Sequence, residues 1–93
     1  MQLLSFNVTG TGATLQISAV TPKINKCKWF QFLSLTGVLN IGGVDTDSSH
    51  GYPIGTQSAN FQPPIALAMD LYDLSAIYFY MGNTDTAVLL CAI

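Results

Sequence analysis

Residues 76–93 read AIYFYMGNTDTAVLLCAI and contain two apolar runs that are separated by a short polar one. In the first run, Ile77, Phe79 and Met81 alternate with Tyr78 and Tyr80 in the two-residue period of a β-strand. The GNTD that follows is typical of a turn. Residues 86–93 carry apolar side chains on both faces, which predicts a strand that is covered on both sides.

The strand pattern continues through the rest of the chain, where Gly, Pro, Asn, Asp and Ser separate short apolar stretches. Two further segments are harder to assign, because Pro63 and Pro64 predict an extended path into residues 65–69, and residues 70–75 suit a loop or a helical turn. We expect the first two strands to form an opening hairpin through a turn at residues 9–12. The expected strands are residues 2–9, 13–20, 25–36, 38–41, 52–54, 60–62, 76–81 and 86–93.

The composition supports the same class of fold. Hydrophobic residues make up 49% of the 93 residues and charged residues only 9%, and the charged side chains are Asp and Lys, without Glu or Arg. Because the charged helix formers Glu and Arg are absent, Lys is rare, and strand and turn residues are abundant, we predict an all-β protein. The length suits one domain over residues 1–93, a small β-sandwich or jelly-roll-like antiparallel domain.

The charges argue against two classes of partner. The net charge is −2, and the one basic cluster consists of Lys23, Lys26 and Lys28, so we expect no nucleic-acid binding. The longest apolar runs, residues 65–69 and 87–93, fall far short of the ~20 residues of a membrane-spanning helix. The first residues lack the pattern of a signal peptide, so we expect synthesis in the cytosol without processing.

A surface so poor in charge cannot safely leave large apolar areas in water, and such areas usually mark contact sites. Apolar residues on both faces of the long strand and the last strand exceed what one thin core requires. We therefore expect a protein partner, in the first place further copies of the chain. The residues expected at this interface are Trp29, Phe30, Phe32, Leu89, Leu90 and Ile93.

Two cysteines, Cys27 and Cys91, are too few and too far apart for a disulfide framework or a zinc site of the paired-cysteine type. Both lie in apolar strands. The favoured interpretation is two reduced thiols that pack as small hydrophobic side chains, and the alternative is a long-range disulfide.

Residues 45–49, DTDSS, place oxygen atoms at alternate positions, as the start of a calcium loop does. His50 occupies the place where that loop needs glycine, and no acidic residue closes the loop, so we expect no metal. His50 is the only histidine, and no catalytic signature surrounds it. Residues 10–12 fit neither common phosphate-loop pattern. We therefore expect no enzyme and no cofactor.

Aromatic residues are a further candidate for binding, because they stack on sugars and bases. The same side chains suit a sandwich core or a subunit contact, which we favour. The residues concerned are Trp29, Phe30, Phe32, Tyr72, Tyr78 and Tyr80.

Three stretches carry a resemblance to a known family. They are residues 36–45, TGVLNIGGVD; residues 49–54, SHGYPI; and residues 73–80, DLSAIYFY, with the closing strand at residues 86–93. Their order resembles that in small β-sandwich domains of bacteriophage virion proteins, such as capsid decoration or cement proteins and the bases of head fibres. In that family a glycine turn leads to a short strand, a polar loop follows, and an Asp-Leu-Ser-x-Ile-Tyr run enters the penultimate strand.

The resemblance covers residues 36–93, whereas residues 1–25 match nothing in the family, and the apolar residues 65–69 are longer than its usual link. It implies a decoration or cement protein, made in the host cytoplasm, that binds the outer face of the assembled capsid as a homotrimer and stabilises contacts between major capsid subunits. The alternatives are a base or adaptor of a phage fibre or tail spike, or a carbohydrate- or host-surface-binding module that uses Trp29, Tyr52 and Tyr72.

Overall fold

The computed structural model describes residues 2–21, 24–56, 59–61 and 72–93, and within these ranges it is almost entirely β-structure with one short 3-10 helix, η1 (Ile17–Ala19). The prediction of an all-β, β-sandwich-like antiparallel fold is confirmed. No helix in the described part of the chain is long and apolar enough to cross a membrane. The strands are β1 (Leu3–Thr9), β2 (Thr14–Gln16), β3 (Lys26–Cys27), β4 (Trp29–Ser34), β5 (Leu39–Gly42), β6 (Tyr52–Ile54), β7 (Ala59–Phe61), β8 (Tyr72–Asp73), β9 (Tyr78–Met81) and β10 (Thr86–Ala92).

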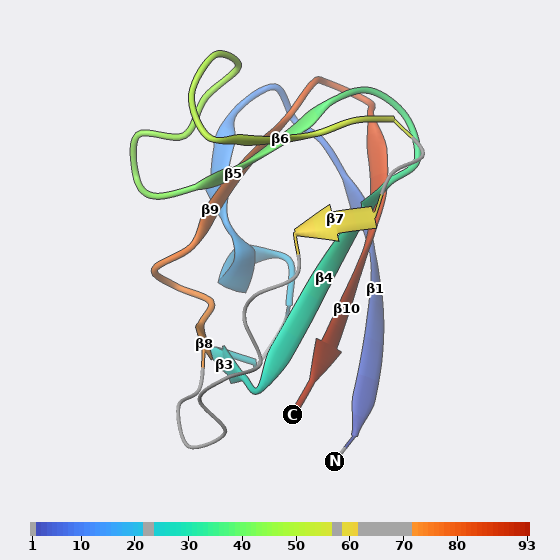
Figure 1. The fold of residues 1–93 in the computed structure, drawn as a ribbon, viewed down its shortest axis with the longest axis vertical. Coiled ribbons are helices and arrows are strands. Elements are labelled where there is room, and N and C mark those ends of the chain that lie inside the picture. Colours follow the sequence, from blue (N-terminus) through green and yellow to red (C-terminus); the bar gives the residue numbers. More distant parts are fainter. Residues whose placement is uncertain (1, 22–23, 57–58, 62–71) are drawn as a thin grey trace.

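Two four-stranded antiparallel sheets make up the body of the molecule (Figure 1). The first sheet has the order β1-β10-β4-β7 and the second the order β2-β9-β5-β6, while β3 and β8 form a small separate ribbon. The strands at the two ends of the chain are neighbours, because Gln2 and Ile93 exchange both main-chain hydrogen bonds at 3.1 and 2.9 Å.

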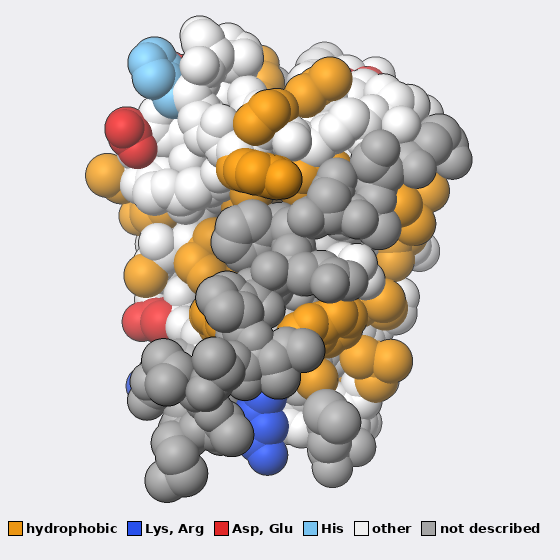
Figure 2. All heavy atoms as spheres, viewed as in Figure 1, with side chains coloured by type: hydrophobic (Ala, Val, Ile, Leu, Met, Phe, Trp, Pro, Cys, Tyr) orange, Lys and Arg blue, Asp and Glu red, His pale blue; other side chains and the backbone are white. Residues whose placement is uncertain are grey.

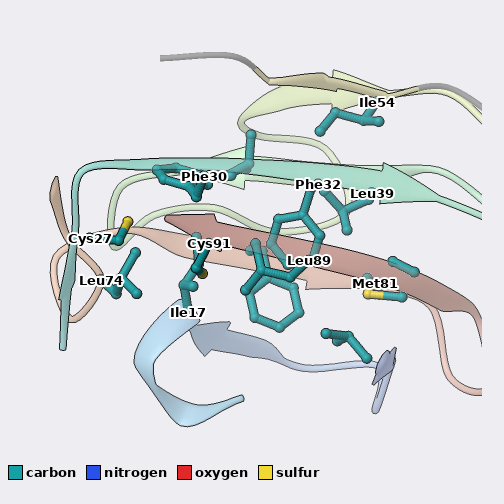
Figure 3. Packing of buried hydrophobic residues seen from close by; sticks show 14 residues of the cluster. Ile17, Cys27, Phe30, Phe32, Leu39, Ile54, Leu74, Met81, Leu89 and Cys91 are labelled. Carbon is teal, nitrogen blue, oxygen red and sulfur yellow. The ribbon is translucent and has the colours of Figure 1, made fainter. Parts of the chain in front are cut away.

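The core lies between the sheets (Figure 3). Every second residue of β4 and of β10 is fully buried, as the strand period requires, and the rings of Phe32 and Phe79 meet across the two sheets with centroids 5.2 Å apart. Phe30 is packed edge-on by Tyr72 of the small ribbon, at 5.7 Å between centroids. These aromatic residues therefore hold the layers together.

The expected opening hairpin is wrong, because β1 pairs with β10 and β2 pairs with β9 of the other sheet. Between them the chain turns a corner beside the β9–β10 turn, where the Gly10 amide donates to the Asp85 carbonyl at 2.7 Å and the Thr84 amide donates to the Gly10 carbonyl at 3.1 Å. A side chain at Gly10 would collide with the Gly82 carbonyl. The glycine thus permits a crossing between sheets and not a hairpin.

Two predicted strands are shorter or broken. The strand expected at residues 13–20 ends at Gln16, because Ile17 begins η1, where the Val20 amide donates to the Ile17 carbonyl. The strand expected at residues 25–36 divides into β3 and β4 at Lys28, whose amide donates to the Ala92 carbonyl at 2.7 Å. A local 3-10 turn therefore ends the first of these strands, and a hydrogen bond to β10 marks the break in the second.

Several expectations lie outside the described residues. They are the path of residues 62–69, including both adjacent prolines, the first part of the loop or turn at residues 70–75, and Lys23 of the basic cluster. The described end of that loop contains β8, which pairs Asp73 with Lys26 of β3.

Candidate functional site

The outer face of the first sheet is the most apolar accessible surface that the register of the strands defines. Side chains at alternate positions of β1, β10 and β4 point away from the second sheet and lie side by side in rows. One row holds Leu3, Ala92 and Trp29, the next Ser5, Leu90 and Gln31, and the third Asn7, Val88 and Leu33. We call the accessible apolar side chains of these rows the apolar face: Leu3, Trp29, Leu33, Val88 and Leu90. Ala92 shares their parity but is buried.

The apolar face is separate from the core. Leu3 is 60% exposed, and Trp29, Leu33, Val88 and Leu90 are half-buried without joining the cluster that fills the space between the sheets. None of the residues of β1, β4 and β10 is charged. Figure 2 shows hydrophobic side chains gathered on the side of the molecule where Figure 1 places these strands. A face of this kind suits a protein contact.

The outer face of the second sheet is different, because a polar loop folds back on it. The Asn40 side chain donates to the Asp47 carbonyl at 2.7 Å, and the hydroxyl of Thr14 donates to the carbonyl of Thr46. The Thr46 hydroxyl in turn donates to the Gly43 carbonyl at 2.6 Å. Polar groups on this side thus bind one another, so the two outer faces of the sandwich differ in chemistry.

The six residues expected at the interface divide between two environments. Phe30, Phe32 and Leu89 are 0% exposed and fill the core. Trp29 and Leu90 lie on the apolar face, and Ile93, at the end of the first sheet, is 37% exposed. The surface open to a partner is therefore offered by the last three.

Leu3, Leu33 and Val88, which complete the apolar face, were not among the residues predicted for the interface. The alternation within residues 29–34 and 86–92 was the signal that could have found two of them, because they share the parity of Trp29 and Leu90. Leu3 follows only from the pairing of β1 with β10.

The polar loop holds an exposed ion pair between Asp47 and His50, whose Oδ1 and Nδ1 atoms are 2.7 Å apart. The Ser49 amide donates to the same carboxylate oxygen at 2.8 Å, and this bond, with that of His50, lowers the pKa of Asp47. The hydrogen bond and the charge of Asp47 raise the pKa of His50. Among the residues that the structure describes, no three His, Cys, Asp or Glu side chains lie close enough to hold a metal ion.

The two cysteines, from β3 and β10, are free and fully buried, and both lie at the same end of the core (Figure 3). Their sulfur atoms are hydrogen-bonded to each other, and this bond together with burial raises the pKa of Cys91. A buried thiol of raised pKa stays protonated at neutral pH and is a poor nucleophile. Cys91 is therefore a packing side chain. The same hydrogen bond lowers the pKa of Cys27, so Cys27 is kept from reagents by its full burial and not by its pKa.

The three aromatic residues considered for glycan binding belong to three different sheets. Trp29 is on the apolar face, Tyr52 is 55% exposed on β6 of the second sheet, and Tyr72 packs its ring against Phe30 from the small ribbon. Stacking on one sugar needs neighbouring rings on one surface. This arrangement gives less support to a glycan site than the apolar face gives to a protein contact.

No protein-family model matches the chain, and no curated protein or solved structure matches it either. The surfaces described above are therefore the basis on which a function can be inferred.

Proposed function

We propose that the protein is a capsid decoration or cement protein of a bacteriophage, which binds the outer face of the assembled shell and stabilises contacts between major capsid subunits. The observation that carries the proposal is the uncharged apolar face of the first sheet. It agrees with the sequence resemblance of residues 36–93 to small virion β-sandwiches. The proposed role is structural, at the capsid surface, and involves no catalytic residue, cofactor, nucleic acid or membrane.

The size of the apolar face suggests how such a protein binds. Three strands about 4.8 Å apart, with about 3.4 Å per residue, present a face of roughly 14 by 20 Å, or about 300 Å². A stable interface buries roughly 800 Å² on each partner, so one copy is expected to bind weakly. Copies linked to one another convert later contacts into intramolecular ones, which multiplies the affinity. The proposal therefore includes self-association as well as shell binding.

Co-sedimentation with shells that lack the protein tests this proposal. The wild-type chain is expected to bind in many copies, whereas Leu90→Asp, which places a charge in the centre of the apolar face, should lower occupancy at least tenfold. Ser48→Asp is the matched control, because it adds the same charge to an exposed residue of the polar loop on the other sheet. Circular dichroism verifies that both variants remain folded.

Equal occupancy for the two variants would count against the apolar face as the contact surface. Wild-type protein that ignores the shells would count against the capsid role itself. A few copies bound at one site of each particle would instead favour the base or adaptor of a fibre or tail spike.

A further inference from the structure

The free edge of β1 is the longest described edge of the two sheets. Gln2 and Ile93 exchange both hydrogen bonds, so in the ladder between β1 and β10 the even-numbered residues of β1 bond to β10. The odd-numbered residues then direct their amide and carbonyl groups away from β10. Figure 1 shows β1 as the outermost strand on that side. The outward-directed residues are Leu3, Ser5, Asn7 and Thr9.

β1 lacks the features that usually prevent an edge strand from pairing with another chain. Natural edges are commonly shortened, charged, bulged or interrupted by proline. The other described edges follow this rule, because β2, β6 and β7 have three residues each, and β6 contains Pro53. In contrast, β1 has seven residues with no charge and no proline, in unbroken register with β10. Such an edge is a template for another strand.

Side chains that point inward from β1 also lack full cover. Leu4 and Phe6 are half-buried, although they share the inward parity of the buried Val8. Leu15 of β2, on the second sheet, is half-buried too. The sandwich is thus apolar at the margin beside β1, where a further strand would cover these side chains.

We propose that a second copy of this chain pairs with β1 in antiparallel orientation, about a two-fold axis at Phe6. Antiparallel pairing through the outward groups requires each odd residue to face another odd residue. With Phe6 at the centre, Ser5 faces Asn7 of the second copy, and Leu3 faces Thr9 of the second copy. This register uses all seven residues of β1 and leaves none of the four outward residues unpaired.

The sequence of β1 favours a second copy of the chain as the partner at this edge. In this register Phe6 faces its own counterpart, and Leu4 faces Val8 of the second copy, so apolar side chains meet on the inward side. No charge opposes another, because β1 has none. The two first sheets become one eight-stranded sheet, and the two apolar faces lie on the same side of it.

This pair goes beyond the proposed function, because it uses the edge of the first sheet and exists without a shell. It also differs from the homotrimer that the resemblance implies, since a two-fold axis joins two copies. The solution mass distinguishes the two assemblies.

The test compares two double variants of the full chain by sedimentation equilibrium. S5K/N7K places lysine opposite lysine twice across the axis, so we expect the dimer to weaken by roughly tenfold. S5K/N7D introduces the same lysine opposite aspartate in both pairs, and we expect it to dimerise at least as tightly as wild type. Both carry outward-facing substitutions at the same two positions, so each controls for the other.

Hydrogen exchange gives a second measurement. Amides of the four outward residues should exchange rapidly in dilute protein and become protected as the dimer forms, while those of Leu4, Phe6 and Val8 are protected throughout. A trimeric mass, a wild-type monomer at every concentration, or equal association of the two double variants would overturn the proposal. Dimerisation without protection of the outward amides would overturn it as well.

Discussion

Leu89 and Leu90 are adjacent in β10 but point to opposite sides of the first sheet, which makes them a matched pair for testing the assignment of its faces. Leu89 is 0% exposed, so its replacement by alanine leaves a cavity in a closed space. Substitutions of this kind cost roughly 2–5 kcal/mol, and we expect about 3 kcal/mol for Leu89→Ala. Leu90 is half-exposed on the apolar face, so Leu90→Ala should cost only about 0.5–1 kcal/mol.

Urea unfolding followed by the fluorescence of Trp29, the only tryptophan, measures both values. With a slope of about 1.5 kcal/mol per molar urea, the midpoint should fall by about 2 M for Leu89→Ala and by less than about 0.7 M for Leu90→Ala. Leu90→Ala should also reduce binding to shells. Equal shifts for the two variants would refute the assignment, because they would mean that both faces of β10 are covered in the isolated protein.

Three further predictions concern other parts of the molecule. Gly37→Ala should destabilise the protein by more than about 1 kcal/mol in thermal unfolding, because Gly37 has a φ of 74° and a Cβ there would collide with the Asp85 carboxylate, whereas Gly43→Ala should change little. In an NMR titration His50 should show a pKa above the usual histidine value of 6.5, and Asp47→Asn should return it toward that value. Because the pKa of His50 is raised, its contribution to the stability of the loop is present below pH 6.5 and is lost as the pH rises. Because the pKa of Asp47 is lowered, its contribution to the same stability is present above pH 3.8 and is lost as the pH falls. The ion pair therefore stabilises the loop most between these two pH values. The two buried cysteines should resist iodoacetamide in native protein and react in denaturant, and rapid labelling of the native protein would contradict their burial.

Local sequence patterns were enough to predict the all-β class and the strands of the second half of the chain other than β8, which lies where a loop or helical turn was expected. The alternation in residues 76–93 corresponds to β9, β10 and the turn between them, because a strand that packs on one side repeats every two residues. Pairing of β1 with β10 was not predictable in this way. Alternation identifies a strand but not its neighbour, and the contact of Gly10 with Gly82 joins residues far apart in the chain.

The candidate surface was only partly predictable for a related reason. Residues 29–34 and 86–92 carry apolar side chains on both faces, so the pattern alone does not say which face the second sheet covers. The packing of the two sheets decides this, because Phe32 meets Phe79 of the second sheet and Trp29, of the opposite parity, lies on the other side. The hydrogen bond between Cys27 and Cys91, which are far apart in the sequence, likewise follows only from the fold.

The pairing of β1 with β10 sets the order in which the protein can fold as it is synthesised. β1 is synthesised well before β10, its hydrogen-bonding neighbour, so the first sheet stays incomplete until residues 86–92 have emerged. Closing a loop of nearly the whole chain costs entropy before contacts repay it, and folds rich in such distant pairs form slowly. During that interval β1 is an apolar segment without its hydrogen-bonding neighbour, and such segments are prone to aggregate.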